Sequence, residues 1–311
     1  MIPFSPPRID QKVIDEVVDT LKSGWITTGP KTKEFERRLT AYCGNKATLA
    51  VNSNTVGLEV VLRWFGVQEG DEVIVPAYTY CATANVIVHC GAKPVMVDVN
   101  ADDFDVCLEN VRRAITDKTK VIMPVDLGGM PCAYDELFEL VETEDVKTLF
   151  RAKTEEQGKL GRILILSDSA HSIGAEYKGR KAGSLADVSV FSFHAVKNLT
   201  TAEGGAIMLN LPEPFDNEEV YRYLCTYTLH GQNKDALAKT KKGAWRYDVL
   251  VSGFKGNMTD IMASIGLVEL SRYEDDTLHY RKCIYDQYTD AFSRYGWAEL
   301  PIYETEDRKS S

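Results

Sequence analysis

The sequence of 311 residues predicts an α/β fold in which helices cover both faces of a mostly parallel sheet. Short apolar runs alternate with amphipathic segments, and strands separated by helical segments favour a parallel sheet. Hydrophobic residues make up 44% and charged residues 26% of the chain. This balance is typical of a globular protein and excludes a disordered chain, a collagen or a membrane bundle. In such a sheet, ligands bind at the loops beyond the carboxyl ends of the strands.

The individual elements follow from the period of the apolar residues and from the residues that end each run. Residues 10–21 repeat apolar side chains with a helical period, and Gly24 ends this helix. Gly44 stops a second helix in the same way. On these criteria we expect helices at 32–42, after the turn at 52–55, and at 82–88, and strands at 48–51, 72–76, 94–97, 121–125, 162–166, 188–193 and 205–209.

Three later regions break the alternation. Residues 142–161 are rich in charge and predict a helix followed by an exposed insertion, and 235–243 predict a polar loop. Residues 260–294 predict long helical material. Its expected packed face is formed by Ile261, Ile265, Leu267 and Leu270. We find no internal repeat. The sequence therefore predicts a large domain over 1–211 and a second region over 212–311, made of long helices and part of a small C-terminal domain.

Charge and cysteine usage limit the partners and the compartment. The 36 basic and 46 acidic residues give a net charge of −10, which repels phosphate backbones, and the tightest basic group, Lys239, Lys241 and Lys242, is typical of a solvated loop. Seven cysteines, an odd number without a C-x-x-C pair, indicate free thiols rather than a disulfide framework. The N-terminus lacks a signal peptide, and no apolar run reaches membrane-spanning length. We expect a cytoplasmic protein with no nucleic-acid or membrane partner.

Lys197 is a candidate for carbonyl chemistry. It follows an apolar strand and precedes the turn 200–205, so its amine can reach into a cleft at the strand exit. Lysine forms Schiff bases with carbonyl compounds when its pKa is lowered from about 10.4. Taken alone, Lys197 is better explained as an ordinary surface lysine.

Asp168 and His171 follow the strand predicted at 162–166. An acid at the end of a buried strand is costly unless it meets a cation, and a pyridinium nitrogen is one such cation. Helix capping is the alternative role for Asp168. His171 is either a core histidine or part of a site, and it lacks partners at metal-ligand spacing. We therefore predict no metal site.

A phosphate site is predicted where a strand turns into a helix at 53–57. A helix N-terminus offers free N–H groups and a favourable dipole, to which Thr55 and Ser192 add hydroxyl donors. Plain helix capping explains the same residues. The sequence has no P-loop motif and no G-x-G-x-x-G motif. Tyr80 offers a ring that can stack on a flat ligand, or a core contact.

Several segments together resemble the pyridoxal-phosphate-dependent nucleotide-sugar aminotransferases of the DegT/StrS family. The resemblance runs in order from Pro3 to about Tyr295, and its 191–198 segment is most similar to the branch that makes UDP-4-amino-4-deoxy-L-arabinose from a UDP-4-keto-pentose for lipid A modification. The segments that carry it are Gly24-Trp25-Ile26-Thr27-Thr28-Gly29-Pro30, 70–76, 91–95, 167–171, 192–197 and Glu203-Gly204-Gly205-Ala206.

The resemblance implies a fold-type-I pyridoxal-phosphate (PLP) enzyme with a seven-stranded type of sheet. Lys197 matches the lysine that binds the cofactor aldehyde, and Asp168 matches the acid on the pyridine nitrogen. His171 falls where the family has Gln or His beside the ring, and Tyr80 falls at the stacking position. These matches change the reading of Lys197 from a surface residue to the cofactor lysine.

The resemblance also implies a phosphate cradle and a homodimer. Asn54, Thr55 and Val56, together with Ser192, match the residues that hold the cofactor phosphate. Asn257 resembles an asparagine that reaches the phosphate of the neighbouring subunit's cofactor. This chain has Ser53-Asn54-Thr55 where the family usually has Ser-Gly-Thr or Ser-Ala-Thr. The sequence stops at Ser311, where the family continues, so we expect an incomplete small domain.

The predicted reaction is transfer of an amino group from an amino acid, by family analogy glutamate, to a keto group of a nucleotide-linked sugar for polysaccharide or lipid A type sugar synthesis. One alternative is a PLP-dependent keto-sugar dehydratase, but dehydratases of the family usually carry His at the position of Lys197. The other is a truncated homologue that binds the cofactor without catalysis. The sequence identifies neither the sugar, nor the nucleotide, nor the carbon that is aminated.

Overall fold

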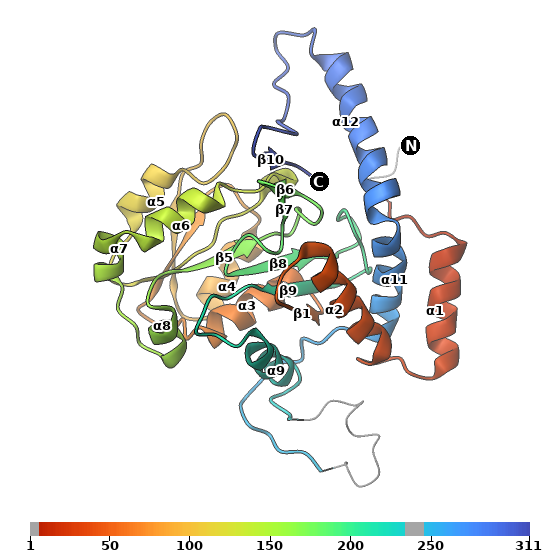
Figure 1. Cartoon of the computed structure of the whole chain (residues 1–311), viewed down its shortest axis with the longest axis horizontal. Helices are drawn as coiled ribbons and strands as arrows, with labels where there is room; N and C mark the ends of the chain where they lie inside the picture. The colour runs from red at the N-terminus through yellow and green to blue at the C-terminus, as the bar shows by residue number, and fades with distance from the viewer. Residues whose placement is uncertain (1–5, 234–245) are drawn as a thin grey trace.

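The computed structural model describes residues 6–233 and 246–311, and its centre is a seven-stranded sheet (Figure 1). The strand order is β1-β9-β8-β5-β4-β2-β3, in which β8, β5, β4, β2 and β3 are parallel and β9 runs against both of its neighbours. The predicted mostly parallel α/β sheet is therefore confirmed. The polar loop predicted at 235–243, with its three lysines, lies outside the described residues.

The strands agree with the predicted positions, with two shifts. The strand expected at 162–166 lies two residues later, and the one expected at 121–125 ends at Ile122. Their bounds are β1 Ala47–Val51, β2 Glu72–Pro76, β3 Lys93–Val97, β4 Thr119–Ile122, β5 Leu164–Asp168, β8 Val188–Ser192 and β9 Gly205–Leu209. The shift of β5 puts Asp168 inside the strand, as its last residue.

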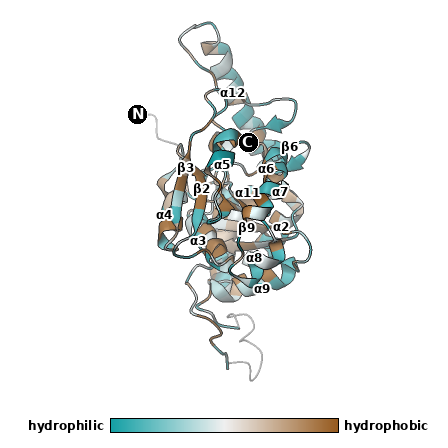
Figure 2. Cartoon of the chain, turned by 90° about the vertical axis from the view of Figure 1, so that its left-hand side faces the viewer, coloured by the Kyte–Doolittle hydropathy of each residue, from teal (hydrophilic) through white to brown (hydrophobic). Residues whose placement is uncertain are grey.

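Helices flank the sheet, and several bury apolar side chains against it (Figure 1). The helices α1 to α4 match their predicted positions, whereas α5, α6 and α9 were not predicted. Their bounds are α1 Gln11–Ser23, α2 Pro30–Cys43, α3 Asn54–Trp64, α4 Cys81–His89, α5 Leu108–Ala114, α6 Tyr134–Glu142 and α9 Asn217–Tyr227. In Figure 2 the strands β2 and β3 carry much of the hydrophobic colour beneath the more hydrophilic outer loops.

The charged insertion is not simply exposed, which corrects the prediction for 142–161. It forms the short helices α7 Glu144–Leu149 and α8 Glu155–Leu160. Gln157 is fully buried, and its side-chain amide donates to the carbonyl of Phe65 at 2.9 Å. Val146 and Phe150 join the core. A few apolar and hydrogen-bonding anchors thus hold a segment whose remaining side chains are charged.

Small residues let α11 (Asp260–Ser271) pack closely against α1 and α2. The buried face is not the one predicted, because only Leu267 of the four expected apolar residues is buried, beside Ala263, Ser264 and Gly266. A Cβ added at Gly266 would lie 2.6 Å from the ring of Phe35. The close approach therefore requires glycine, and the aliphatic residues of α11 are only partly covered.

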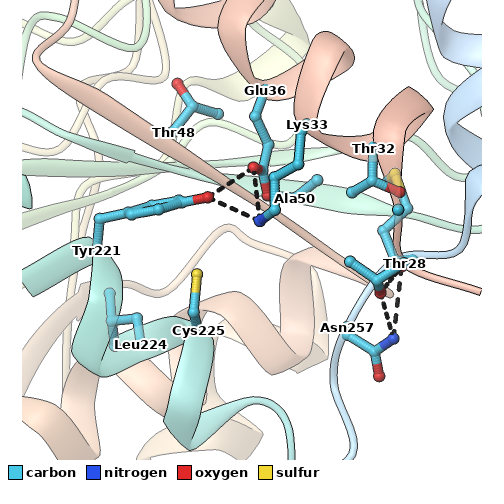
Figure 3. A network of polar contacts seen from close by, with 12 residues as sticks. Thr28, Thr32, Lys33, Glu36, Thr48, Ala50, Tyr221, Leu224, Cys225 and Asn257 are labelled. Carbon is cyan, nitrogen blue, oxygen red and sulfur yellow. Dashed lines mark hydrogen bonds and ion pairs between the residues drawn. The ribbon is translucent and has the colours of Figure 1, made fainter. Parts of the chain in front are cut away.

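Two carboxylates far apart in sequence hold the N-terminal helices in place. The Asp260 carboxylate accepts from the backbone amides of Gly29, Lys31 and Thr32, so it caps α2, whose own N-cap residue is a glycine. The Glu36 carboxylate accepts from the amide of Ala50 at 3.0 Å, on the open edge of β1 (Figure 3). Both contacts satisfy backbone donors that the local sequence leaves without a partner.

The C-terminal helices leave the α/β body at one side. After α11 the chain makes one wide π-helical turn, Tyr273–Leu278, and continues as α12, His279–Phe292, which extends beyond the body in both views (Figures 1 and 2). The last residues return to form β10 (Arg308–Lys309) beside β6 (Glu176–Tyr177) and β7 (Arg180–Lys181). The division of the chain at residue 211 remains a prediction.

Burial keeps the core cysteines protonated. Cys43, Cys90 and Cys132 are buried thiols without a disulfide, as the sequence predicted for the cysteines in general. Burial raises the pKa of Cys43 to about 12 and that of Cys90 to about 11. These thiols are therefore poor nucleophiles at neutral pH. Within residues 6–233 and 246–311, no helix is both long and apolar enough to cross a membrane.

Candidate active site

The site lies where the carboxyl ends of β1, β5 and β8 meet the amino end of β9 (Figure 1). Asp168 ends β5, Ser192 ends β8, and β1 leads through Ser53 into α3. A Cβ added at Gly205, the first residue of β9, would lie 2.6 Å from the amide nitrogen of Asn54. Glycine at 205 therefore lets the start of α3 approach the sheet edge.

Asp168 is a buried carboxylate surrounded by neutral donors. Its side chain accepts from the amide of Asn54 at 3.1 Å, from the hydroxyl of Thr83 at 2.8 Å and from the backbone N–H of Ala170 at 3.3 Å. No cationic side chain of the described residues comes within 4.0 Å of it. Burial raises the pKa of Asp168, which the hydrogen bonds from Thr83, Ala170 and Asn54 oppose. The three hydrogen bonds favour the ionised form of Asp168, but no cationic side chain of the described residues contacts its carboxylate.

Lys197 and His171 face each other across the same cavity. The Nζ atom of Lys197 lies 2.6 Å from Nε2 of His171. Desolvation and the charges of Lys197 and Arg281 lower the pKa of His171 to about 4, so the imidazole is neutral and Nε2 accepts the hydrogen bond. Burial also lowers the pKa of Lys197, although the charge of Asp168 acts in the opposite direction. A larger fraction of the Lys197 amine is therefore neutral at a given pH than it would be in water.

The start of α3 provides the anion-binding end of the site. The hydroxyl of Ser53 accepts from the backbone N–H of Val56 at 3.2 Å and so caps the helix. The amides before Val56, with the side chains of Thr55 and Ser192, line the cavity. Val56 was predicted to bind the cofactor, but its amide is held by Ser53 and its side chain does not line the cavity.

These residues enclose a cavity of about 430 Å³. It brings together all but two of the predicted site residues: Asn54, Thr55, Tyr80, Asp168, His171, Ser192 and Lys197. Tyr80 is 78% exposed, so its ring lies at the mouth of the cavity rather than in the core. Asn54 links the two ends of the site, because its side chain bonds Asp168 and the carbonyl of Val190 while its backbone begins α3.

Asn257 lies outside the cavity of its own chain. Its amide donates to the hydroxyl of Thr28 at 2.6 Å (Figure 3). Its side-chain oxygen accepts from Lys255. Its backbone pairs with Val51 at the end of β1. The side chain is half-buried. It therefore lies at the edge of the sheet beside Thr28 and is not among the residues that line the cavity.

Sequence reasoning missed Asp126, which also lines the cavity. Its buried carboxylate accepts from the hydroxyls of Tyr134 at 2.7 Å, Ser169 at 3.1 Å and Ser172 at 2.6 Å. Its backbone N–H donates to the carbonyl of Asp168 at 3.2 Å. This network of hydrogen bonds holds the carboxyl end of β5, where Asp168 lies. The signal was available, because Asp126 follows an apolar run just as Asp168 does.

The cavity fits pyridoxal phosphate. The cation that the buried Asp168 carboxylate lacks is supplied by a protonated pyridine nitrogen, and the Lys197 amine faces the same space. The α3 N-terminus lies in the same cavity for a phosphate group. In the part of the chain that the structure describes, no group of three His, Cys, Asp or Glu side chains could hold a metal ion.

The fold and cavity are those of a fold-type-I PLP-dependent aminotransferase. Residues 7–311 match the model of the DegT/DnrJ/EryC1/StrS aminotransferase family, and the chain belongs to that family. Its structural neighbours include a sugar aminotransferase solved in PMP and PLP forms, so the predicted family, the enzyme class of PLP-dependent sugar aminotransferase and the cofactor are confirmed at this level.

Solved structures and curated proteins agree with this assignment. Spr1654 of Streptococcus pneumoniae, assigned as a sugar aminotransferase, matches in its PMP form with 51% identity and a TM-score of 0.95, over 100% of this chain and 77% of that one. Its PLP form matches with 49% identity and a TM-score of 0.91, over 99% and 76%. The spore coat polysaccharide biosynthesis protein SpsC of Bacillus subtilis is 34% identical over 99% of this chain and 73% of its own length.

The chain is shorter than these relatives. An uncharacterised protein of Methanocaldococcus jannaschii, MJ1066, is 40% identical over 88% of this chain, which spans 65% of the length of MJ1066.

Proposed function

We propose that this protein transfers an amino group from an amino acid, glutamate, to a keto group of a nucleotide-linked sugar. The observation that carries the proposal is the pairing of a buried, cation-free Asp168 with Lys197 in one cavity. Asp260 is also buried without a cation, but it caps α2 with its hydrogen bonds, whereas Asp168 lines a cavity that also contains a lysine. The name of SpsC supports a product used in surface polysaccharide. The finer proposal, from the 191–198 segment, is a UDP-4-keto-pentose acceptor.

Asp168 holds a proton on the ring nitrogen of the cofactor. When bound, pyridoxal phosphate supplies a reactive aldehyde and a ring that accepts the electron pair released at the substrate carbon. The Asp168 carboxylate keeps that ring cationic, and the cationic ring in turn favours the ionised carboxylate. Asn54 and Thr83 orient the carboxylate with hydrogen bonds to its two oxygens.

Lys197 anchors the cofactor and then moves protons. Its lowered pKa leaves a larger fraction of neutral amine, which is the nucleophilic form. With the donor bound to the cofactor in its place, the freed Lys197 amine would be the group positioned to take a proton from the donor carbon and to deliver it as a general acid. His171, neutral and 2.6 Å away, accepts a hydrogen bond from Lys197 and orients it.

The phosphate end fixes the position of the cofactor. Thr55, Ser192 and the first amides of α3 donate to the phosphate, and the helix dipole favours its charge. Tyr80 covers the ring from the mouth of the cavity. With both ends held, the reacting carbon stays within reach of Lys197.

The functional unit in this proposal is a homodimer with two shared sites. Asn257, which does not line the cavity of its own chain, would bind the phosphate of the partner's cofactor. The outer face of α1 and the residues after it expose Ile14, Val18, Leu21 and Ile26, which supports burial against a second chain. We place the dimer in the cytoplasm because its core thiols require a reducing compartment.

A spectrum tests the proposal against its two alternatives. With L-glutamate, the absorbance of the bound cofactor aldehyde should disappear, and a panel of nucleotide keto-sugars should contain one that restores it. A non-catalytic homologue would leave the spectrum unchanged with every amino acid. A dehydratase would consume a keto-sugar without needing the donor in stoichiometric amounts. Either result would contradict the proposed aminotransferase.

A further inference from the structure

A second cavity, of about 260 Å³, also has Lys197 in its lining. Its walls come from three parts of the chain: the N-terminal residues 6–8, the loop 195–200 and the junction of α11 with α12. A ligand in this cavity therefore lies beside Lys197, which lines both cavities. This is the position that a reacting substrate needs.

Among the described residues, the charged side chains of the second cavity form ion pairs except for Arg281 and Lys197, and Lys197 is hydrogen-bonded to His171. Arg8 and Asp276 form an ion pair of 2.9 Å, and Glu269 is paired with Arg272. Within the described residues, the Arg281 guanidinium has neither a hydrogen bond nor an ion pair. The lining thus carries three cations, Arg8, Lys197 and Arg281, and two carboxylates. The cavity can therefore hold one anionic group, because its lining has one cation more than it has carboxylates and its volume is sufficient.

The π-helical turn Tyr273–Leu278 fixes where Arg281 lies. The hydroxyl of Tyr273 donates to the carbonyl of Ile173 at 2.8 Å, close after His171 in the chain. A Cβ added at Gly174 would lie 2.8 Å from the side chain of Leu278, so the turn packs tightly against this segment. Wide turns of this kind are frequent at functional sites. The start of α12 is therefore held beside the active site, and the charge of Arg281 helps to lower the pKa of His171.

We propose that Arg281 binds the carboxylate of the amino donor in this second cavity. An amino acid carries its α-carboxylate on the same carbon as the amine that must replace Lys197. The cation that binds this carboxylate must consequently lie close to Lys197. Arg281 meets this condition, because it lines the same cavity as Lys197. Arginine is suited to this role because its planar fork binds a carboxylate through two hydrogen bonds.

A nucleotide diphosphate fits the same cavity less well. The diphosphate is separated from the ring ketone by carbons of the sugar, so it does not have to lie beside Lys197. The α-carboxylate of an amino acid is bonded to the carbon that carries the reacting amine, so it must lie close to this lysine. This inference rests on the proposed function, because it assumes that an amino acid is one of the substrates.

Binding of glutarate and of UDP to the holoenzyme tests the inference without turnover. Glutarate has the carboxylates of the donor but no amine, so it cannot react. Calorimetry should give a dissociation constant for glutarate that Arg281→Gln raises about 10- to 100-fold, the usual loss for a charge-assisted pair. Arg281→Lys should recover part of the affinity. The neighbouring Lys282 does not line this cavity, so Lys282→Gln, which loses the pair with Asp286 and the ring contacts with Tyr285 and Tyr303, should bind glutarate as the wild type does.

The reaction with L-glutamate adds a second readout. Arg281→Gln should raise the half-saturating donor concentration by the same factor, with a limiting rate close to that of the wild type, because the interaction is made before the reaction begins. Wild-type affinity for glutarate in Arg281→Gln, or a loss of UDP affinity without loss of glutarate affinity, would overturn the assignment. If no amino acid reacts with the wild type, the proposed function fails, whereas the Arg281-dependent binding of glutarate is still measured separately.

Discussion

Two buried aspartates in opposite electrostatic states lie at the two ends of strand β5: Asp168 is its last residue, and Asp187, which precedes β8, contacts its amino end. At its amino end, Asp187 accepts from the backbone N–H of Ile165 at 3.0 Å and from two nitrogens of Arg162 at 2.7 and 2.8 Å. At its carboxyl end, Asp168 receives only neutral donors. Both carboxylates are almost fully buried. The comparison distinguishes Asp187, whose ion pair stabilises the fold, from Asp168, whose carboxylate is placed to bind a cationic ligand.

Lys197→Ala should have the largest effect at the ligand end of β5. Among residues 6–233 and 246–311, no other amine lines the first cavity, so neither covalent capture of the cofactor nor proton transfer has a substitute there. Turnover should fall below detection, and borohydride should fix no cofactor to the chain. Lys282→Gln is the matched control on the exposed surface. A borohydride-stable adduct together with normal turnover in Lys197→Ala would remove the assignment of this lysine.

Asp168→Asn should separate function from stability. Loss of the charge on the ring nitrogen should slow the reaction with glutamate by about 10²-fold or more, because the ring then accepts electrons poorly. Burial raises the pKa of Asp168, so the ionised form is costly in the apoprotein at neutral pH and asparagine relieves that cost. The apo variant should unfold at the same or a higher temperature than the wild type. An unchanged half-reaction rate would reduce Asp168 to a structural residue.

Asp187→Asn should give the reverse result. Removing one partner of the buried pair leaves the Arg162 guanidinium without its main counter-ion, which typically costs about 3–5 kcal/mol of unfolding free energy. The rate per folded molecule should remain that of the wild type. Thermal and urea unfolding measure the first effect, and cofactor-normalised rates measure the second. Strong loss of rate with normal stability would show that the two ends of β5 do not differ as described.

The sheet was well predicted, while contacts between distant segments were not. Strands such as β2 and β9 coincide with their predicted bounds because each is a continuous buried apolar run. The small sheet of β6, β7 and β10 was missed, since two-residue strands are too short to show a period. Lys197 and Asp168 were found through their motifs. Arg281 was not, because a helix position gives no indication that its side chain meets a loop 84 residues earlier, around Lys197.

Mixed dimers test whether Lys197 of one chain and Asn257 of the other chain serve the same site. Lys197→Ala and Asn257→Asp should each be inactive or weak, the second because a new carboxylate opposes the phosphate. Equal mixing gives heterodimers in which one site carries both defects and the other none, so about a quarter of all sites should be intact. Activity of that order after refolding the mixture supports shared sites. No gain over the two parent dimers, or an active monomer on sedimentation, would refute them.

The smallest expected effect concerns acid stability through His171. Its pKa is lowered to about 4 in the folded protein, whereas the unfolded chain takes up this proton near pH 6.5. Acidification from pH 7 to 5 therefore favours the unfolded state, and this contribution is absent at higher pH. His171→Gln should reduce the fall in unfolding temperature over that range. His279→Gln, at an exposed position of α12, should not, and equal slopes for all three proteins would contradict the neutral His171.

The protonation of the cofactor ring is the most direct test of the central claim, that Asp168 is the counter-ion of a bound pyridinium. Holoprotein prepared with ¹⁵N-labelled pyridoxal phosphate can be compared with Asp168→Asn and Asp187→Asn by NMR at neutral pH. We expect a protonated ring nitrogen in the wild type and in Asp187→Asn, and an unprotonated one in Asp168→Asn. A ring nitrogen that stays protonated in Asp168→Asn, or that is unprotonated in the wild type, would contradict the account.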